Sequence, residues 1–442
     1  MSKKLKRSRI FESMVAYLQK QFAQLPDARV GQNKFISMGD IGLSAFSIFF
    51  NQCPSFLQHQ RLMQSRSGAN NARSLFGIEH IPTDNHIRDL LDFVAPEAVY
   101  PVFHEGLKQL EASGILESFR YFSGQLLLPV DGLHYFSSEK VHCDNCNTKH
   151  HKEGRVSYSH SMMSATLVHP EQREVIPLPP EFIEPQDGGE KEDCERVAIH
   201  RWLAKWGKYY ARLGVTILGD DLYGCQPVCE AVLKEGCHFI FTCKESSHKC
   251  LYEWVTPLKE QGKLKEINHT IKIKAKPYRY RCFYVNQVPV RDGADAMQVN
   301  WCCVEVFDRS NKRVYSGAFI TDHEMTDKNV AEIAHAGRTR WKTENEHNNT
   351  LKNHGYYLEH NYGHGKQHLA STLATLILLS FLFHNLLALL DERYQRLKGY
   401  YSRKFFFDQL RTITVFMYFV SWDILLENIY QASKFGSHHD TS

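Results

Sequence analysis

An apolar segment that ends on an acidic residue constrains the fold of this chain more than any other feature. The segment Leu126–Val130 is followed at once by Asp131 and Gly132. A short apolar run bounded by turn residues is typical of a buried strand. A buried carboxylate without a partner is costly. Asp131, at the predicted carboxyl end of a core strand, therefore needs a counter-charge, a metal ion or an exit to solvent, unless it only opens an Asp-Gly turn.

A second segment repeats this design. Val215–Gly219 is β-branched and apolar, and Asp220 and Asp221 follow it. A crossover helix predicted over Glu192–Leu213 would make the two strands parallel, so that both acids emerge at the same edge of the sheet. Like charges at close range disfavour joint ionisation unless a cation lies between them.

The third segment of interest is Arg338–Lys352, which contains no Gly or Pro and is predicted to be a helix. Arg340, Glu344 and Asn348 are spaced four residues apart and would share one helix face, with Lys352 one step further along. Such a stripe is either a solvated ladder of ion pairs or, after two strands that end in acids, the third part of a site.

Taken in order, these motifs carry a family resemblance. Asp131, the Asp220-x-x-Tyr223 turn, and Arg340-x-x-x-Glu344 followed by Lys352 resemble the catalytic signatures of bacterial insertion-sequence DDE transposases of the cut-and-paste type. Within that family, the chain is similar to the branch whose last acid lies in a Tyr, Arg, Glu, Lys pattern. The resemblance covers about Gln125 to Leu390.

Two positions depart from the family pattern. Gly337 stands where the family has a tyrosine, and Lys352 lies one residue later than the usual spacing. Glu346 is therefore a rival to Glu344, which is preferred because it shares a face with Arg340. Asp221 is likewise a rival to Asp220, which is preferred because the family places its acid three residues before an aromatic residue.

The resemblance implies an α/β fold, with a ribonuclease H-like mixed-sheet core, a β-rich insertion before the last acid, and helical N-terminal and C-terminal regions. We expect five regions: a helical DNA-binding region 1–124, a first core part 125–243, the β-rich insertion 244–325, a second core part 326–390, and a helical region 391–442 with dimer contacts.

The resemblance also implies the chemistry. Asp131, Asp220 and Glu344 would hold two Mg²⁺ ions, with Mn²⁺ as a substitute, while Arg340 and Lys352 would bind phosphate oxygens. The partners would be the DNA ends of the element and target DNA, held by a homodimer on paired ends. The protein would work in the bacterial cytoplasm, associated with the nucleoid when bound to DNA.

The β-rich region offers further DNA contacts. Strands are predicted over Ile271–Ile273, Tyr278–Val285, Val299–Phe307 and Arg313–Ile320. Basic residues, of which Lys274 and Arg279 are the main candidates, are expected to alternate on one strand face: Lys272, Lys274, Lys276, Arg279 and Arg281. This pattern indicates either a nucleic-acid groove or an edge strand protected by charge.

A pair of cysteines suggests a second metal. Cys143-x-x-Cys146 is half of a zinc site, or else a turn with two free thiols. The other ligands would come from His150, His151, His160 or Cys194. His360 and His364, beside Gly363 and Gly365, are interpreted as ordinary histidines of a flexible loop.

Composition limits the class of protein. The 442 residues are 43% hydrophobic, which supports a substantial core, and the net charge of +4 is only mildly basic, although Lys3–Arg9 forms a concentrated basic arm suited to phosphate backbones. We expect no secretory signal, because Lys3–Arg9 is followed by an amphipathic segment, and twelve scattered cysteines favour a reducing compartment. The apolar run Leu369–Leu390 is long enough to span a bilayer, but its polar residues favour a buried helix and no membrane contact.

The termini are predicted to be helical. Helices are expected over Ile10–Phe22, Asp40–Phe50 and Thr83–Val94, with a loop over Gln64–Arg73, and helices again over Asp391–Tyr430. Two other functions use the same residues: a metal-dependent DNA nuclease, and a non-catalytic DNA-binding protein derived from a transposase.

Overall fold

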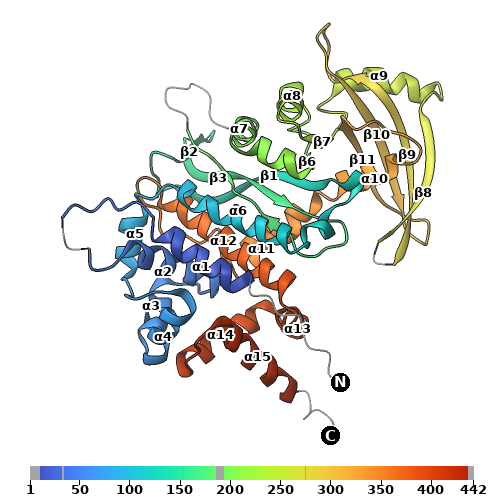
Figure 1. Ribbon diagram of the computed structural model, residues 1–442. Helices are drawn as coiled ribbons and strands as arrows, with labels where there is room; N and C mark the ends of the chain where they lie inside the picture. The colour runs from blue at the N-terminus through green and yellow to red at the C-terminus, as the bar shows by residue number, and fades with distance from the viewer. Residues whose placement is uncertain (1–9, 32–33, 153, 186–193, 274, 437–442) are drawn as a thin grey trace.

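The protein forms one mixed sheet covered by helices. The computed structural model describes residues 10–31, 34–152, 154–185, 194–273 and 275–436 (Figure 1). The basic arm Lys3–Arg9 and Lys274 lie outside this described part of the chain. The strands are β1 (Leu126–Ser138), β2 (Asn147–His150), β3 (Val156–Leu167), β4 (Ile176–Pro177), β5 (Glu181–Ile183), β6 (Val215–Gly219), β7 (His238–Thr242), β8 (Lys265–Ile273), β9 (Lys276–Pro289), β10 (Gln298–Phe307) and β11 (Arg313–Thr321).

The helices lie mainly before, between and after these strands. The α-helices are α1 (Ile10–Phe22), α2 (Met38–Phe50), α3 (Phe56–Gln64), α4 (Arg66–Asn71), α5 (Asp84–Leu91), α6 (Tyr100–Ala112), α7 (Glu195–Leu213), α8 (Gln226–Lys234), α9 (Lys249–Glu260), α10 (Val330–Arg338), α11 (Asn349–Asn353), α12 (Leu369–Leu390), α13 (Glu392–Tyr400), α14 (Arg403–Phe416) and α15 (Trp422–Gly436). Two π-helical turns, η1 (Ala72–Phe76) and η5 (Thr343–Asn348), and three 3₁₀ turns, η2 (Pro96–Val99), η3 (Leu116–Phe119) and η4 (Phe122–Gly124), complete the described elements.

The central strands combine parallel and antiparallel pairing. The strand order is β2-β3-β1-β6-β7-β11-β10-β9-β8, with β1, β6 and β7 parallel to one another and β3 antiparallel to β1. Helices α7 and α8 cover one face of these strands, and α6 and α12 cover the other (Figure 1). The predicted crossover helix is confirmed as α7. The mixed α/β fold with helical regions at both ends is confirmed as well.

Strand β1 is longer than the sequence suggests. Asp131 was expected at its carboxyl end, and this expectation is wrong, because β1 continues to Ser138. Its parallel pairing with β6 spans Leu126–Pro129, whereas its antiparallel pairing with β3 spans Val130–Ser138. Asp131 therefore lies just beyond the end of the pairing with β6, where the pairing with β3 continues. The edge of β1 that faces β6 is open beside Asp131.

The β-rich region extends the same sheet, because β11 pairs with β7 and carries β10, β9 and β8 beyond it. The expected row of basic residues on a single strand is wrong. β8 ends at Ile273 and β9 begins at Lys276, so Lys272 lies on one strand and Lys276, Arg279 and Arg281 on the next. In this hairpin Lys272 pairs with Pro277, and Lys276 pairs with Ile273, which puts Lys272 and Lys276 on opposite faces.

The N-terminal region is helical, as predicted. α1 spans the predicted residues, and Thr83 caps α5 by accepting a hydrogen bond from the backbone N–H of His86. The predicted loop over Gln64–Arg73 is wrong, because Ser65 caps α4. The Asn71 side chain then donates to the carbonyl oxygens of Thr414 and Met417, at distances of 2.6 and 2.7 Å, so C-terminal contacts stabilise this polar helix.

Helix α12 is the central helix of the core. Of the helices described, it is the one that is long and apolar enough to cross a membrane, and 94% of its most apolar window is buried inside the fold. It packs against α2, α6 and α13. The interpretation of Leu369–Leu390 as a buried helix is consistent with this packing and with a soluble protein.

Candidate active site

The register of β1 and β6 brings two acids together. Leu126 pairs with Val215 and Pro129 pairs with Leu218. Two further steps along each strand lead to Asp131 and Asp220. Neighbouring strands lie about 4.8 Å apart. The two predicted carboxylates therefore emerge side by side at the same edge of the parallel pair.

The surroundings of Asp131 favour the uncharged form of its carboxyl group. Burial raises the pKa of its carboxyl from the ordinary value of 3.8 to about 7, against the lowering effect of the Arg340 guanidinium. Negative charges on Glu344, Glu195 and Asp220 raise it further. Asp131 is thus the centre of a cluster of four carboxylates.

The alternative acid Asp221 faces a different set of partners. Its Oδ1 lies 2.6 Å from Lys244 Nζ, and its Oδ2 accepts a hydrogen bond from Ser247 Oγ at 2.7 Å. Burial acts to raise the pKa of Asp221, but its contacts with Lys244 and Ser247 outweigh burial and lower this pKa. Asp220, whose charge acts on Asp131, is therefore the better candidate for the site.

The third acid lies on an irregular helix. The single helix predicted over Arg338–Lys352 is wrong, because α10 ends at Arg338 and the π-helical turn η5 begins at Thr343. The regular α-helix α11 resumes at Asn349. π-Helical turns are frequent at functional sites, because the extra residue per turn re-aims the side chains around it.

The face expected for this segment is present despite the irregularity. Arg340 Nη2 lies 2.6 Å from Glu344 Oε1, and Arg340 Nη1 lies 3.5 Å from Asp131 Oδ1. Asn348 Nδ2 donates to Asp131 Oδ2 at 2.9 Å. Of the two rival glutamates, Glu344 is the one paired with Arg340. The guanidinium therefore lies between the first and third acids.

Glu195 is a fourth acid that the sequence analysis missed. It begins α7, and its Oε2 accepts a hydrogen bond from Tyr223 Oη at 3.1 Å. A Cβ atom added to Gly132 would lie 2.0 Å from Glu195 Oε1, so a larger residue here would displace the Glu195 carboxylate. The signal was an acid in the first turn of the predicted crossover helix, which starts at the edge of the sheet where parallel strands end.

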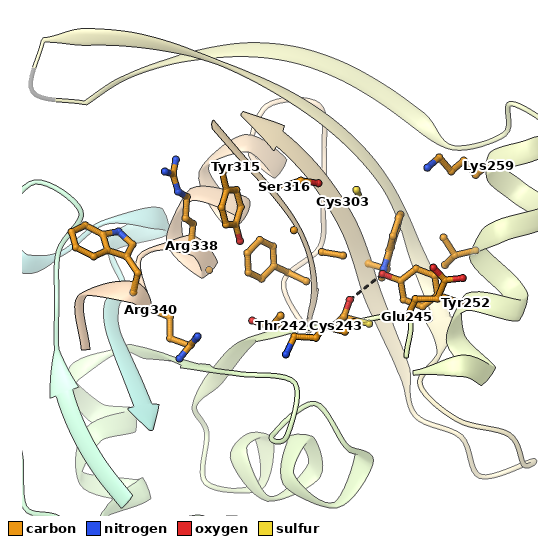
Figure 2. A pocket seen from close by; sticks show the side chains of 18 of the residues that line it. Thr242, Cys243, Glu245, Tyr252, Lys259, Cys303, Tyr315, Ser316, Arg338 and Arg340 are labelled. Carbon is orange, nitrogen blue, oxygen red and sulfur yellow. Dashed lines mark hydrogen bonds between the residues drawn. The ribbon is translucent and has the colours of Figure 1, made fainter. Parts of the chain in front are cut away.

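A cleft of about 920 Å³ extends from this site towards the β-rich strands. Arg338 and Arg340 lie on one side of it and Lys259 on the other, with Tyr315 beside Arg338 (Figure 2). Arg338 stacks on the Tyr315 ring at 4.7 Å. The wall also contains Glu344, the half-exposed Trp341, and Lys244. A groove that joins four cations to aromatic planes suits a nucleic-acid strand.

The other predicted DNA contacts lie apart from this cluster. Lys352 Nζ forms an ion pair with Glu359 Oε1 at 2.7 Å. Arg279 donates to the side-chain oxygens of Asn268 and Asn311 and stacks on Phe307 at 4.2 Å. Both cations therefore have protein partners in the free protein.

The cysteine pair belongs to a separate place in the fold. Cys143 and Cys146 lie in and beside the loop that follows β1, and they contact His160 of β3 and His364, but not His150, His151 or Cys194 among the contacts described.

Comparison of the sequence with protein-family models, and with curated proteins, found no match to this chain.

Proposed function

We propose that the protein is a DDE transposase, which binds the ends of its own insertion element and catalyses metal-dependent cleavage and joining of DNA strands. One observation carries this proposal. β1, β6 and η5 bring Asp131, Asp220 and Glu344 near one another, with Arg340 paired to the first and third. Burial, together with the negative charges of Glu344, Glu195 and Asp220, raises the pKa of Asp131 to about 7 against the lowering effect of Arg340.

The donor set fits divalent cations. Carboxylate oxygens are the ligands that Mg²⁺ and Mn²⁺ prefer. Positive charge beside Asp131 would favour its ionised form, which burial and the neighbouring carboxylates disfavour. We propose that Asp131, Asp220 and Glu344 hold two Mg²⁺ ions, which when bound supply Lewis acids for the attacking and leaving oxygens of an in-line displacement at phosphorus.

The remaining side chains have roles of their own. Arg340, which offsets the charge of Asp131 and Glu344 in the free protein, would turn to a phosphate oxygen once cations neutralise those acids. Asn348 orients Asp131 through the hydrogen bond between their side chains. The cleft with Lys244, Lys259 and Arg338 would then hold the DNA strand next to the reacting phosphate.

The sheet supports a ribonuclease H-like core as part of the same proposal. An antiparallel pair, β3 and β1, continues into the parallel strands β6 and β7. The first acid lies on β1 and the second directly follows β6. On this proposal, β8–β10 form an arm beyond the core that lines the bound DNA end.

The proposal is tested by cleavage of DNA that carries the ends of the element. Asp131→Asn, Asp220→Asn and Glu344→Gln should each abolish Mg²⁺-dependent cleavage while binding of the same DNA persists. Asp221→Asn and Glu346→Gln are the matched controls and should stay within a few-fold of wild type. Wild-type cleavage by any of the first three variants would remove that acid from the site.

A further inference from the structure

Four potential metal ligands converge at a place that the proposed reaction does not use. Cys143, Cys146, His160 and His364, hereafter the Cys2His2 cluster, each point one ligand atom at the others, and all four atoms lie within 4.8 Å of one another. Cys146 and His160 are buried, and the other two are half-buried.

The distances match a tetrahedral metal site. Bonds of about 2.3 Å to sulfur and about 2.0–2.1 Å to nitrogen place two sulfurs about 3.8 Å apart, and a sulfur and a nitrogen about 3.6 Å apart, in a tetrahedron. The Sγ atoms of Cys143 and Cys146 are 3.9 Å apart. His160 Nε2 lies 3.5 Å from each Sγ, and His364 Nε2 lies 3.5 Å from Cys146 Sγ.

Aromatic rings fix the two imidazoles. The ring of His160 stacks on Tyr135 with centroids 5.6 Å apart, and Phe136 contacts both His160, at 5.7 Å, and His364, at 4.5 Å. Both aromatic residues belong to β1, the strand that carries Asp131.

The loop that presents His364 is held tightly. The interpretation of its glycines as a sign of a flexible turn does not fit the packing, because a Cβ on Gly365 would lie 2.2 Å from Asp92 Oδ1. The same Asp92 carboxylate accepts hydrogen bonds from the backbone N–H groups of Lys366 and Gln367. Asn145, between the two cysteines, donates to the Gln367 carbonyl at 2.7 Å. His364 is therefore placed for ligation.

We propose that the Cys2His2 cluster binds one structural Zn²⁺ ion. Zinc takes four ligands of these types in closed structural sites. The ion would join the loop after β1 to the segment between α11 and α12, and so fasten the strand of Asp131 to the chain that follows Glu344. This inference goes beyond the proposed function and stands independently of it.

Metal analysis of the full-length protein tests this proposal. Protein purified without chelators should contain about one zinc per chain, and Co²⁺ in its place should give the visible spectrum of a tetrahedral thiolate site. Cys146→Ser and His364→Ala should lose the zinc and melt at a temperature several degrees lower. His360→Ala, an exposed histidine of the same loop, is the matched control and should keep both properties.

A ligand swap separates ligation from folding. His364→Cys should retain the zinc, because a thiolate can replace an imidazole, even if His364→Ala fails to fold. A wild-type protein that neither contains zinc nor yields the Co²⁺ spectrum would overturn the proposal. Unchanged zinc content in soluble His364→Ala would remove His364 from the site. None of these measurements involves DNA cleavage, so their outcome is separate from that of the transposase assignment.

Discussion

Replacing Asp131 with asparagine should stabilise the protein at alkaline pH in the absence of divalent cations. The folded pKa of about 7 exceeds the ordinary value of 3.8. The stability that the neutral carboxyl contributes is therefore fully present below about pH 4 and is lost as the pH rises through about 7. Asparagine stays neutral, keeps an oxygen that can accept the hydrogen bond from Asn348, and escapes this loss.

The magnitude follows from the two pKa values. A difference of one in pKa is worth about 1.4 kcal/mol, so ionised Asp131 costs the folded protein at most about 4 kcal/mol above pH 7. A little over half of this cost develops between about pH 5 and about pH 8. Because Asp131 is partly exposed, we expect the stabilisation by Asp131→Asn to grow by about 1–2 kcal/mol over that interval.

The assay is urea denaturation in EDTA at about pH 5 and at about pH 8. Asp221→Asn is the matched control, and its effect on stability should have the opposite sign. The lowered pKa of Asp221 contributes stability at neutral pH, and this contribution is lost only as the pH falls through the lowered pKa of the folded protein. Adding Mg²⁺ at about pH 8 should stabilise the wild type more than Asp131→Asn. A stability difference between wild type and Asp131→Asn that does not change with pH would refute the account of a crowded, buried carboxyl.

Two further predictions concern the neighbours of Asp131. Glu195→Gln removes a negative charge and should lower the pKa of Asp131, so the variant should lose less stability than the wild type as the pH rises to about 8. If Glu195 supports the site, cleavage of DNA by this variant should also fall by about tenfold or more. Arg340→Ala and Lys352→Ala should each flatten the salt dependence of DNA binding by about one unit of slope, with changes in stability of at most about 1 kcal/mol for Lys352→Ala. Curves that overlay the wild type would assign Lys352 to its ion pair with Glu359 alone.

Local sequence patterns predicted the features that depend on short-range chemistry. The apolar segments before Asp131 and Asp220 became strands β1 and β6, because their side chains are fully buried. The spacing of Arg340 and Glu344 predicted that they share one face, where they form an ion pair. The cap residue Thr83 predicted helix α5, and the amphipathic pattern of Ile10–Phe22 predicted helix α1.

The features that were missed depend on contacts between distant segments. β1 continues past Asp131 because β3 pairs with it as far as Ser138, and no local signal marks how far that pairing extends. The polar segment Gln64–Arg73 is helical because Asn71 binds carbonyl groups of the C-terminal region. Glu195 and His364 reach Asp131 and Cys146 only through folding, and the local signal for Glu195 was its place in the first turn of the predicted crossover helix.

The test that most directly addresses the central claim is strand joining. Purified protein would be incubated in Mg²⁺ with DNA carrying the sequences that flank the gene, together with a target plasmid. We predict that the wild type joins the 3′ ends of the element to the target, and that Glu344→Gln binds the same ends and joins none. Ends that are cut and degraded without joining would indicate a nuclease, and joining by Glu344→Gln at the wild-type level would contradict the three-acid site itself.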